Sequence, residues 1–159
     1  MRKIIFLFIL SFFINQNCSA QNNSEINGNW NSLKQSFISK SEIVLQLTGK
    51  LQKSKKTDKT ELAKTALNAK ELKVECQKTV LNKDAVIKLK QKNNELNTYL
   101  VRLLVNLESD LKMKTNENVL NSMDQLQNVD NQIFIQIKKH NQICLDLNKK
   151  ELIFEVIQK

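Results

Sequence analysis

The sequence predicts an all-α fold, an up-down antiparallel bundle of three to four long helices. The chain contains no proline, and its only glycines are Gly28 and Gly49. Sheets need turns, and turns usually need Gly, Pro or Asn-Gly, so this composition favours long helices joined by few loops. Apolar residues also recur in alternating steps of three and four along most of the chain. This spacing is typical of helices that pack against other helices.

The first bundle helix is predicted over about residues 29–53. Its apolar stripe has a single gap, which Lys40 fills, and Gly49 weakens its last turns. The polar residues 21–27 that precede this helix are expected to lie outside it. The stripe consists of Trp30, Leu33, Phe37, Val44, Leu47 and Leu51.

A second helix is predicted over about residues 59–81, followed by a third that ends near residue 109. Asp58 followed by Glu61 resembles the capping box that starts many helices. The expected break between the two helices is at residues 82–84, although no residue there forbids one continuous helix. The predicted apolar positions are Leu62, Ala66, Ala69, Cys76 and Val80 in the second helix, and Val86, Leu89, Leu96, Leu100, Leu103 and Leu107 in the third.

The last segment predicts one helix over about residues 116–157, roughly 60 Å long at 1.5 Å per residue. Asp130, His140 and Glu151 interrupt its apolar stripe. Burying Asp130 or His140 without a partner is costly, so each should meet a lysine, an amide or water across the bundle. We interpret them as residues that fix the helix register, with a ligand site as the alternative. The stripe consists of Val119, Met123, Leu126, Ile133, Ile137, Cys144, Leu147 and Phe154.

The N-terminus has the three-part order of a secretory signal peptide. Arg2 and Lys3 precede an apolar run over residues 4–14, and residues 18–20 end in a small alanine. We therefore predict cleavage before Gln21. A helix made of the apolar run reaches only about 16 Å, about half the thickness of the hydrocarbon layer, so a stable transmembrane span is not expected.

The predicted organisation is a signal peptide over residues 1–20 and a single helical-bundle domain over residues 21–159. The general secretory route would deliver this domain to the periplasm or to the outside of the cell. Two alternatives keep the domain anchored to a membrane. In one the leader stays uncleaved, and in the other Cys18 is lipidated.

Lysine dominates the charged surface. The formal net charge is +9, and removing the leader takes away Arg2 and Lys3, which leaves +7. We interpret this surplus as a solvated surface, with an acidic partner as the alternative. Export argues against nucleic acid as that partner. So does the presence of Arg102 as the only arginine after the leader, because arginine is the usual reader of phosphates and bases.

Signatures of enzymes are missing from the sequence, including a glycine-rich phosphate loop, a G-x-S-x-G elbow and an H-E-x-x-H pair. With one histidine in the chain, neither a zinc site nor a di-iron site is expected. His140 and Cys144 lie one helical turn apart, but a thiol on an apolar stripe is usually inert packing. Cys76 and Cys144 are either packed thiols or a disulfide formed after export. We predict no catalytic residue, no metal and no cofactor.

Several residues in the second half lie at fixed distances from one another, and the asparagines among them are not explained by apolar stripes. These residues are Glu108, Met113, Lys114, Asn116, Asn118, Val119, Ile133, Asn141, Asn148 and Phe154. Their spacing resembles the C-terminal pattern of the LemA family of bacterial envelope proteins, which has Glu, Leu-Lys, Asn-x-Asn-Phe, Tyr-Asn, Asn and Phe-Pro. Trp30 and the leucine-rich residues 43–48 are similar to the N-terminal pattern of that family.

The chain departs from this family pattern at several places. Leu45, Leu111 and Glu155 stand where the family has prolines, and His140 stands where it has a tyrosine. Residues 53–95 hardly match. The resemblance implies an up-down bundle of long antiparallel helices, typically anchored to a membrane and facing away from the cytoplasm. It implies no catalysis, because the family has no agreed biochemical activity.

We therefore expect a non-enzymatic exported interaction or scaffold protein with an envelope protein as its partner. Asn141 and Asn148 are seven residues apart, so they would share one helix face, which with Asn131 and Lys138 forms the candidate contact face. The alternative is a periplasmic binding module that holds a small apolar or anionic ligand in a cavity beside the buried polar residues. Homo-oligomerisation and membrane association through the N-terminus stay open.

Overall fold

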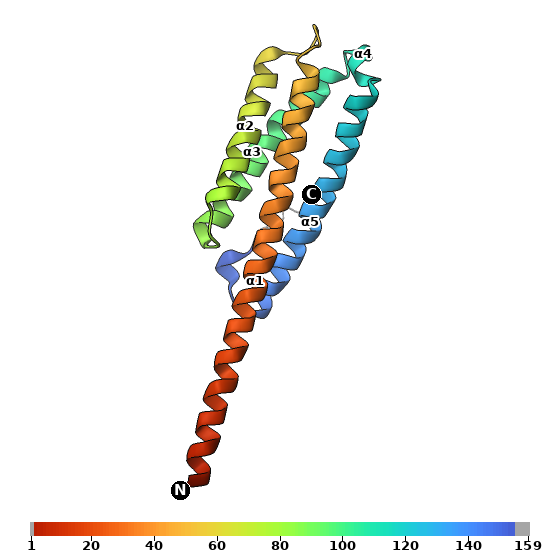
Figure 1. The fold of residues 1–159 in the computed structure, drawn as a ribbon. Helices are drawn as coiled ribbons and strands as arrows, with labels where there is room; N and C mark the ends of the chain where they lie inside the picture. Colours follow the sequence, from red (N-terminus) through yellow and green to blue (C-terminus); the bar gives the residue numbers. More distant parts are fainter. Residues whose placement is uncertain (1, 155–159) are drawn as a thin grey trace.

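Four long helices form an up-down antiparallel bundle (Figure 1). The computed structural model describes the backbone of residues 2–154 and the side chains of residues 24–154. These residues contain no strand, so the predicted fold class is confirmed. The elements are α1 (Arg2–Leu51), α2 (Lys59–Lys78), α3 (Lys83–Leu107), the single turn α4 (Leu111–Lys114), α5 (Glu117–Asp146) and the 3-10 turn η1 (Lys150–Leu152).

The helix starts are fixed by polar side chains. Asp58 accepts a hydrogen bond from the backbone N–H of Thr60 at 2.7 Å, and Asn82 accepts one from Ala85 at 2.8 Å. Asn116 caps α5 in the same way. Such acceptors satisfy N–H groups that the first turn of a helix leaves unpaired. The predicted cap at Asp58 is thereby confirmed. The predicted break between the second and third helices is present, but it lies at residues 79–82 instead of 82–84, because α2 ends at Lys78 and α3 begins at Lys83.

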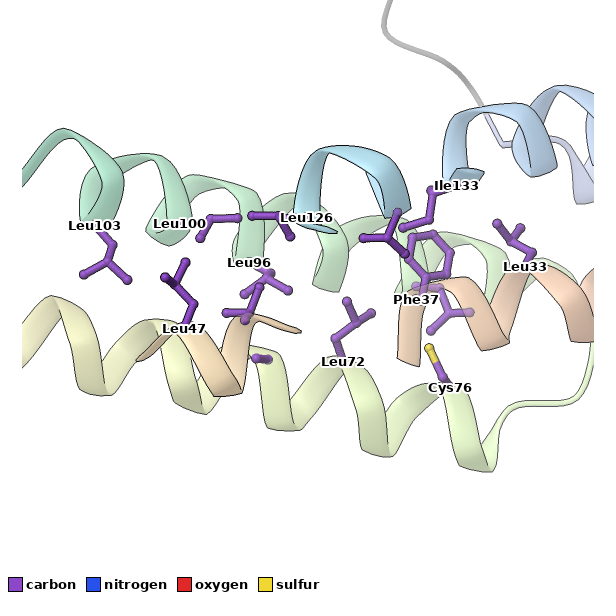
Figure 2. Packing of buried hydrophobic residues seen from close by; sticks show 14 of the residues in the cluster. Leu33, Phe37, Leu47, Leu72, Cys76, Leu96, Leu100, Leu103, Leu126 and Ile133 are labelled. Carbon is purple, nitrogen blue, oxygen red and sulfur yellow. The ribbon is translucent and has the colours of Figure 1, made fainter. Parts of the chain in front are cut away.

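The apolar stripes of the helices meet along the bundle axis, where they form one extended core (Figure 2). Most positions predicted from the sequence are buried in it. Val80 is an exception, because α2 ends at Lys78 and the following loop leaves the valine 77 % exposed. Buried residues in view include Leu33, Phe37, Leu47, Leu72, Cys76, Leu96, Leu100, Leu103, Leu126 and Ile133.

The helices do not contact one another equally. α1 packs against both α2 and α5, and α2 packs against α3. In contrast, α3 and α5 approach each other closely at few positions. One side of the bundle is therefore more open than the others.

The expectation that residues 21–27 lie outside the first helix is wrong, because α1 runs through them. Gly28 does not break the helix, since it has no positive φ angle. Ile26 is 1 % exposed and packs with Ile143, Cys144 and Leu152, so tertiary burial supports this part of α1. The backbone of the predicted leader continues the same helix beyond the bundle (Figure 1). In residues 2–154, no helix has the length and the apolar character needed to cross a bilayer.

The expectation of one helix over residues 116–157 is also wrong, because α5 ends at Asp146. Asn148 has a φ of 54°, in the left-handed region that stops a helix. The N–H of Lys149 then donates to Cys144 O at 2.7 Å, and the N–H of Asn148 donates to Leu145 O at 3.0 Å. These two bonds form a Schellman motif, in which the chain turns back on the last helical turn. As a result, Leu152 and Phe154 are buried beside the bundle instead of extending α5.

Candidate functional site

His140 is fully buried where α1, α5 and the returning C-terminal segment meet. Its Nδ1 lies 3.1 Å from Asn29 Oδ1, and its Nε2 lies 3.1 Å from Leu152 O and 3.4 Å from Cys144 Sγ. Asn29 Nδ2 in turn donates to Gln136 Oε1 at 3.1 Å. The predicted requirement for an amide partner across the bundle is therefore met by Asn29 on α1.

A neutral imidazole donates from only one of its nitrogens. If Nδ1 carries the proton, it donates to Asn29 Oδ1, and Nε2 can accept from the Cys144 thiol. If Nε2 carries the proton, it donates to Leu152 O. Burial lowers the pKa of His140, and the Leu152 carbonyl opposes that shift, so the ring is held in its neutral form at neutral pH.

The Cys144–His140 pair has the properties of packed core groups. Burial raises the pKa of Cys144 to about 11, whereas a nucleophilic cysteine needs a lowered pKa and access to its substrate. Cys76 is also a buried free thiol, and burial raises its pKa to about 12. No group of three His, Cys, Asp or Glu residues in the described part of the chain is arranged to hold a metal ion.

Aromatic rings surround this histidine. The Phe154 ring lies edge-on to His140, with ring centroids 5.8 Å apart, and Trp30 lies 5.8 Å from His140 and 6.1 Å from Phe154. Asn141 fixes the position of Phe154 by donating to its carbonyl at 2.7 Å and accepting from its N–H at 2.8 Å. This cluster ties the C-terminal segment to the rest of the bundle.

Lys40 is another buried polar residue, and it links three helices. It is 1 % exposed, and its ammonium lies 2.6 Å from Asp130 Oδ1 on α5 and donates to Asn97 Oδ1 on α3 at 2.6 Å. The expected lysine partner of Asp130 is therefore present. In the sequence, Lys40 could be recognised because it interrupts an apolar stripe. No feature of the sequence distinguished Asn97 as a partner of this lysine.

A groove of about 560 Å³ lies on the open side of the bundle, between α3 and α5. We call it the α3–α5 groove. Asp130 borders it, and its apolar floor extends to Val101 and Leu120, which are 60 % and 44 % exposed. Its lining residues are Asn97, Leu100, Val101, Leu104, Leu120, Met123, Asp124, Leu126, Gln127, Asp130 and Asn131.

The four residues of the predicted contact face do not occur together on one helix face. Asn131 and Lys138 are exposed on α5, and the Lys138 ammonium lies 4.4 Å from the centre of the Phe134 ring. Asn141 is half-buried and bonded to the C-terminal backbone, and Asn148 lies past the end of the helix. The shared face inferred for Asn141 and Asn148 depended on a helix that ends too early to provide it. Of the four, Asn131 alone lines the α3–α5 groove.

The comparison with protein families agrees with this architecture. No curated protein and no solved structure matches the chain. The profile described as the LemA family matches residues 29–155, which include Trp30, Lys40, Asp130, His140 and most of the bundle. The chain therefore belongs to the LemA family.

Proposed function

We propose that this chain is a non-enzymatic interaction protein of the cell envelope that receives an apolar helix of a partner protein in the α3–α5 groove. The signal-peptide-like N-terminus supports a location outside the cytoplasm, either free or anchored through that N-terminus. The observation that carries the proposal is the groove itself. It is an apolar channel between two helices that contact each other at few positions.

The shape of the groove suits a helix. Its lining residues on α5 extend from Leu120 to Asn131, a length of about 16 Å at 1.5 Å per residue, or roughly three helical turns. Ridges on an added helix can pack between α3 and α5 in the way that bundle helices pack against one another. Val101 and Leu120 are the exposed apolar side chains that such a helix would cover. Amphipathic helices commonly bind in grooves of this kind.

The charge of the groove indicates which helix it would accept. Asp124 and Asp130 are the charged residues among its lining, and Lys40 neutralises only Asp130. A partner helix with basic residues flanking its apolar face would complement this rim.

A photo-reactive amino acid placed at Val101 tests the proposal in living cells. We expect a discrete cross-linked partner at Val101 and none at Leu67, an equally apolar control position that is 56 % exposed on α2. The adduct should disappear in a Leu120→Glu variant that retains its helix content and thermal unfolding. Adducts that are the same at Val101 and Leu67, or that survive Leu120→Glu, would overturn the assignment of the groove.

A small apolar ligand is the second candidate occupant. The groove volume of about 560 Å³ is within the range of ligand pockets, and Asp130 borders it as expected for a binding module. The two lining carboxylates favour a neutral or cationic ligand over the anionic one that we considered from the sequence. Native mass spectrometry of the exported protein distinguishes the candidates, because a retained small molecule that Leu120→Glu expels would favour this second one.

A further inference from the structure

A second cavity, of about 320 Å³, lies between the α1–α2 loop and the α4 turn. Both segments are at the end of the bundle opposite the N-terminus of α1 (Figure 1). The α1–α2 loop forms one wall and the α4 turn forms the other. The cavity is lined by four lysines and a single carboxylate, that of Asp110. The lining residues, which we call the basic tip, are Lys53, Ser54, Lys55, Lys56, Asp110, Leu111, Lys112 and Met113.

Buried hydrogen bonds fix the two walls relative to each other. The Ser54 hydroxyl donates to the Asp110 carboxylate, and both side chains are less than one-tenth exposed. Ser54 Oγ also accepts from the N–H of Lys56 at 3.0 Å and that of Thr57 at 3.1 Å. The carboxylate of Asp110 accepts from the N–H of Met113 at 3.3 Å. The only acidic group of the tip is therefore used internally, and the loops are held in place before any ligand arrives.

The lysines of the tip keep an excess of positive charge. Among the ion pairs of the described residues, none includes Lys53, Lys55 or Lys112. The Lys56 ammonium donates to Ser109 O at 3.4 Å, and its charge also acts on the Asp110 carboxylate. Four lysines and one carboxylate therefore line the cavity, and this excess of positive charge attracts anions.

Leu111 adds a feature that a soluble anion would not use. It lies between Asp110 and Lys112 and is 72 % exposed, so the tip carries an apolar side chain among its lysines. Lysines around an exposed apolar residue match the interface of an anionic bilayer, where charged headgroups overlie the acyl chains.

We propose that the basic tip docks on an anionic lipid surface. The phosphate of a lipid headgroup occupies the cavity between the lysines, and Leu111 enters the boundary between headgroups and acyl chains. Because the tip lies at the opposite end from the N-terminus of α1, this contact is separate from any anchoring by the leader (Figure 1). It is also separate from the α3–α5 groove, with which it shares no lining residue.

Tryptophan fluorescence of the exported protein tests this docking. Trp30 is buried and gives a constant background, so a Leu111→Trp variant reports on the tip. With phosphatidylglycerol vesicles we expect its emission to shift to the blue and to be quenched by brominated acyl chains. Val80→Trp, at an exposed site in the opposite loop, is expected to show neither effect. Vesicles of phosphatidylcholine alone should leave both variants unchanged.

Charge-matched variants decide whether the lysines carry the binding. In the Leu111→Trp background, Lys55→Gln with Lys112→Gln should weaken vesicle binding about twenty-five-fold, at about fivefold for each charge near an anionic surface. The control pair Lys78→Gln with Lys83→Gln, at the other end of the bundle, should change it little. The proposal would be overturned if both pairs of substitutions weakened vesicle binding equally. Complete displacement from the vesicles by inorganic phosphate would also overturn it, because the site would then bind a soluble anion.

Discussion

The Asn141 side chain pairs with both backbone groups of Phe154, donating from Nδ2 to the carbonyl at 2.7 Å and accepting from the N–H at 2.8 Å. The single amide of Asn141 thus supplies the hydrogen bonds that a helix or strand would otherwise give to the N–H and carbonyl of Phe154. Burial of Phe154 beside Trp30 and His140 depends on this pairing, because the chain has already turned back after α5.

We expect Asn141→Ala to destabilise the fold by about 1–3 kcal/mol, because it leaves the buried N–H and carbonyl of Phe154 without partners. Gln142→Ala is the matched control, since the exposed Gln142 side chain bonds only to Asp146 on the same helix. Urea unfolding of both variants measures the difference. Equal stability of the two would show that water replaces Asn141 without cost.

Asn148 gives a second prediction about the same turn. Its φ of 54° suits glycine, so Asn148→Gly should retain or slightly raise the stability. Asn148→Ala should lower it by about 1 kcal/mol, because alanine keeps the disfavoured β-carbon but lacks the short polar side chain that lets asparagine adopt the left-handed region. The two midpoints in urea, compared with that of the wild type, give this order directly. An alanine variant as stable as the glycine variant would argue against the left-handed stop.

The regular part of the fold could be predicted from the sequence because it depends on local periodicity. The steps of three and four in α1, α3 and α5 locate the core, and the polar residues at Asp58 and Asn82 locate two helix starts. The end of α5 could not be found in this way. The apolar stripe continues to Phe154, and only the backbone conformation of Asn148 separates the helix from the turn.

The two polar residues in the apolar stripe of α5 were recognised from the sequence, but the groove was not. Asp130 and His140 stand out in an apolar stripe, and their need for partners follows from the cost of burial. The groove depends on how far apart α3 and α5 lie, which no residue in either helix specifies. The roles of Asn116 and Asn141 were also hidden, because a cap, a clamp and a contact surface all use the same amide.

The stability of the fold should fall more when Asp130 is replaced than when Lys40 is replaced. Asp130→Ala leaves the buried Lys40 ammonium with Asn97 Oδ1, 2.6 Å away, as its remaining acceptor. We expect a loss of about 2–3 kcal/mol of stability, moderated because Asp130 is partly exposed. Lys40→Met fills the same space without a charge and leaves a carboxylate that water can reach, so its loss should be below about 1 kcal/mol. A double-mutant cycle in urea tests this order, and a more costly Lys40→Met would contradict it.

The two buried cysteines should be unreactive in the folded protein. Their pKa values of about 12 for Cys76 and about 11 for Cys144 leave almost no thiolate at neutral pH, and burial blocks access. We expect a thiol reagent to modify both cysteines in denaturant without a reductant. In the native state, modification of either cysteine should be no faster than unfolding. Peptide mass mapping identifies the modified residues. A failure to react in denaturant would contradict the free thiols of the structure and would indicate a disulfide instead.

His140 should make the stability depend on pH in a defined window. Burial lowers its folded-state pKa below the ordinary 6.5, so the unfolded chain binds the proton first as the pH falls. The contribution of neutral His140 to the free energy of unfolding is therefore fully present above pH 6.5 and is lost as the pH falls toward the lower folded-state pKa. The free energy of unfolding then changes by at most about 1.4 kcal/mol per pH unit. Because the chain has one histidine, His140→Gln should remove this slope, while the effect of the carboxylates at lower pH remains. Unfolding by urea across this range measures both proteins. An unchanged slope in His140→Gln would mean that another group titrates there, and a rise in stability on acidification would mean that Asn29 Oδ1 and Leu152 O hold the imidazolium better than water does.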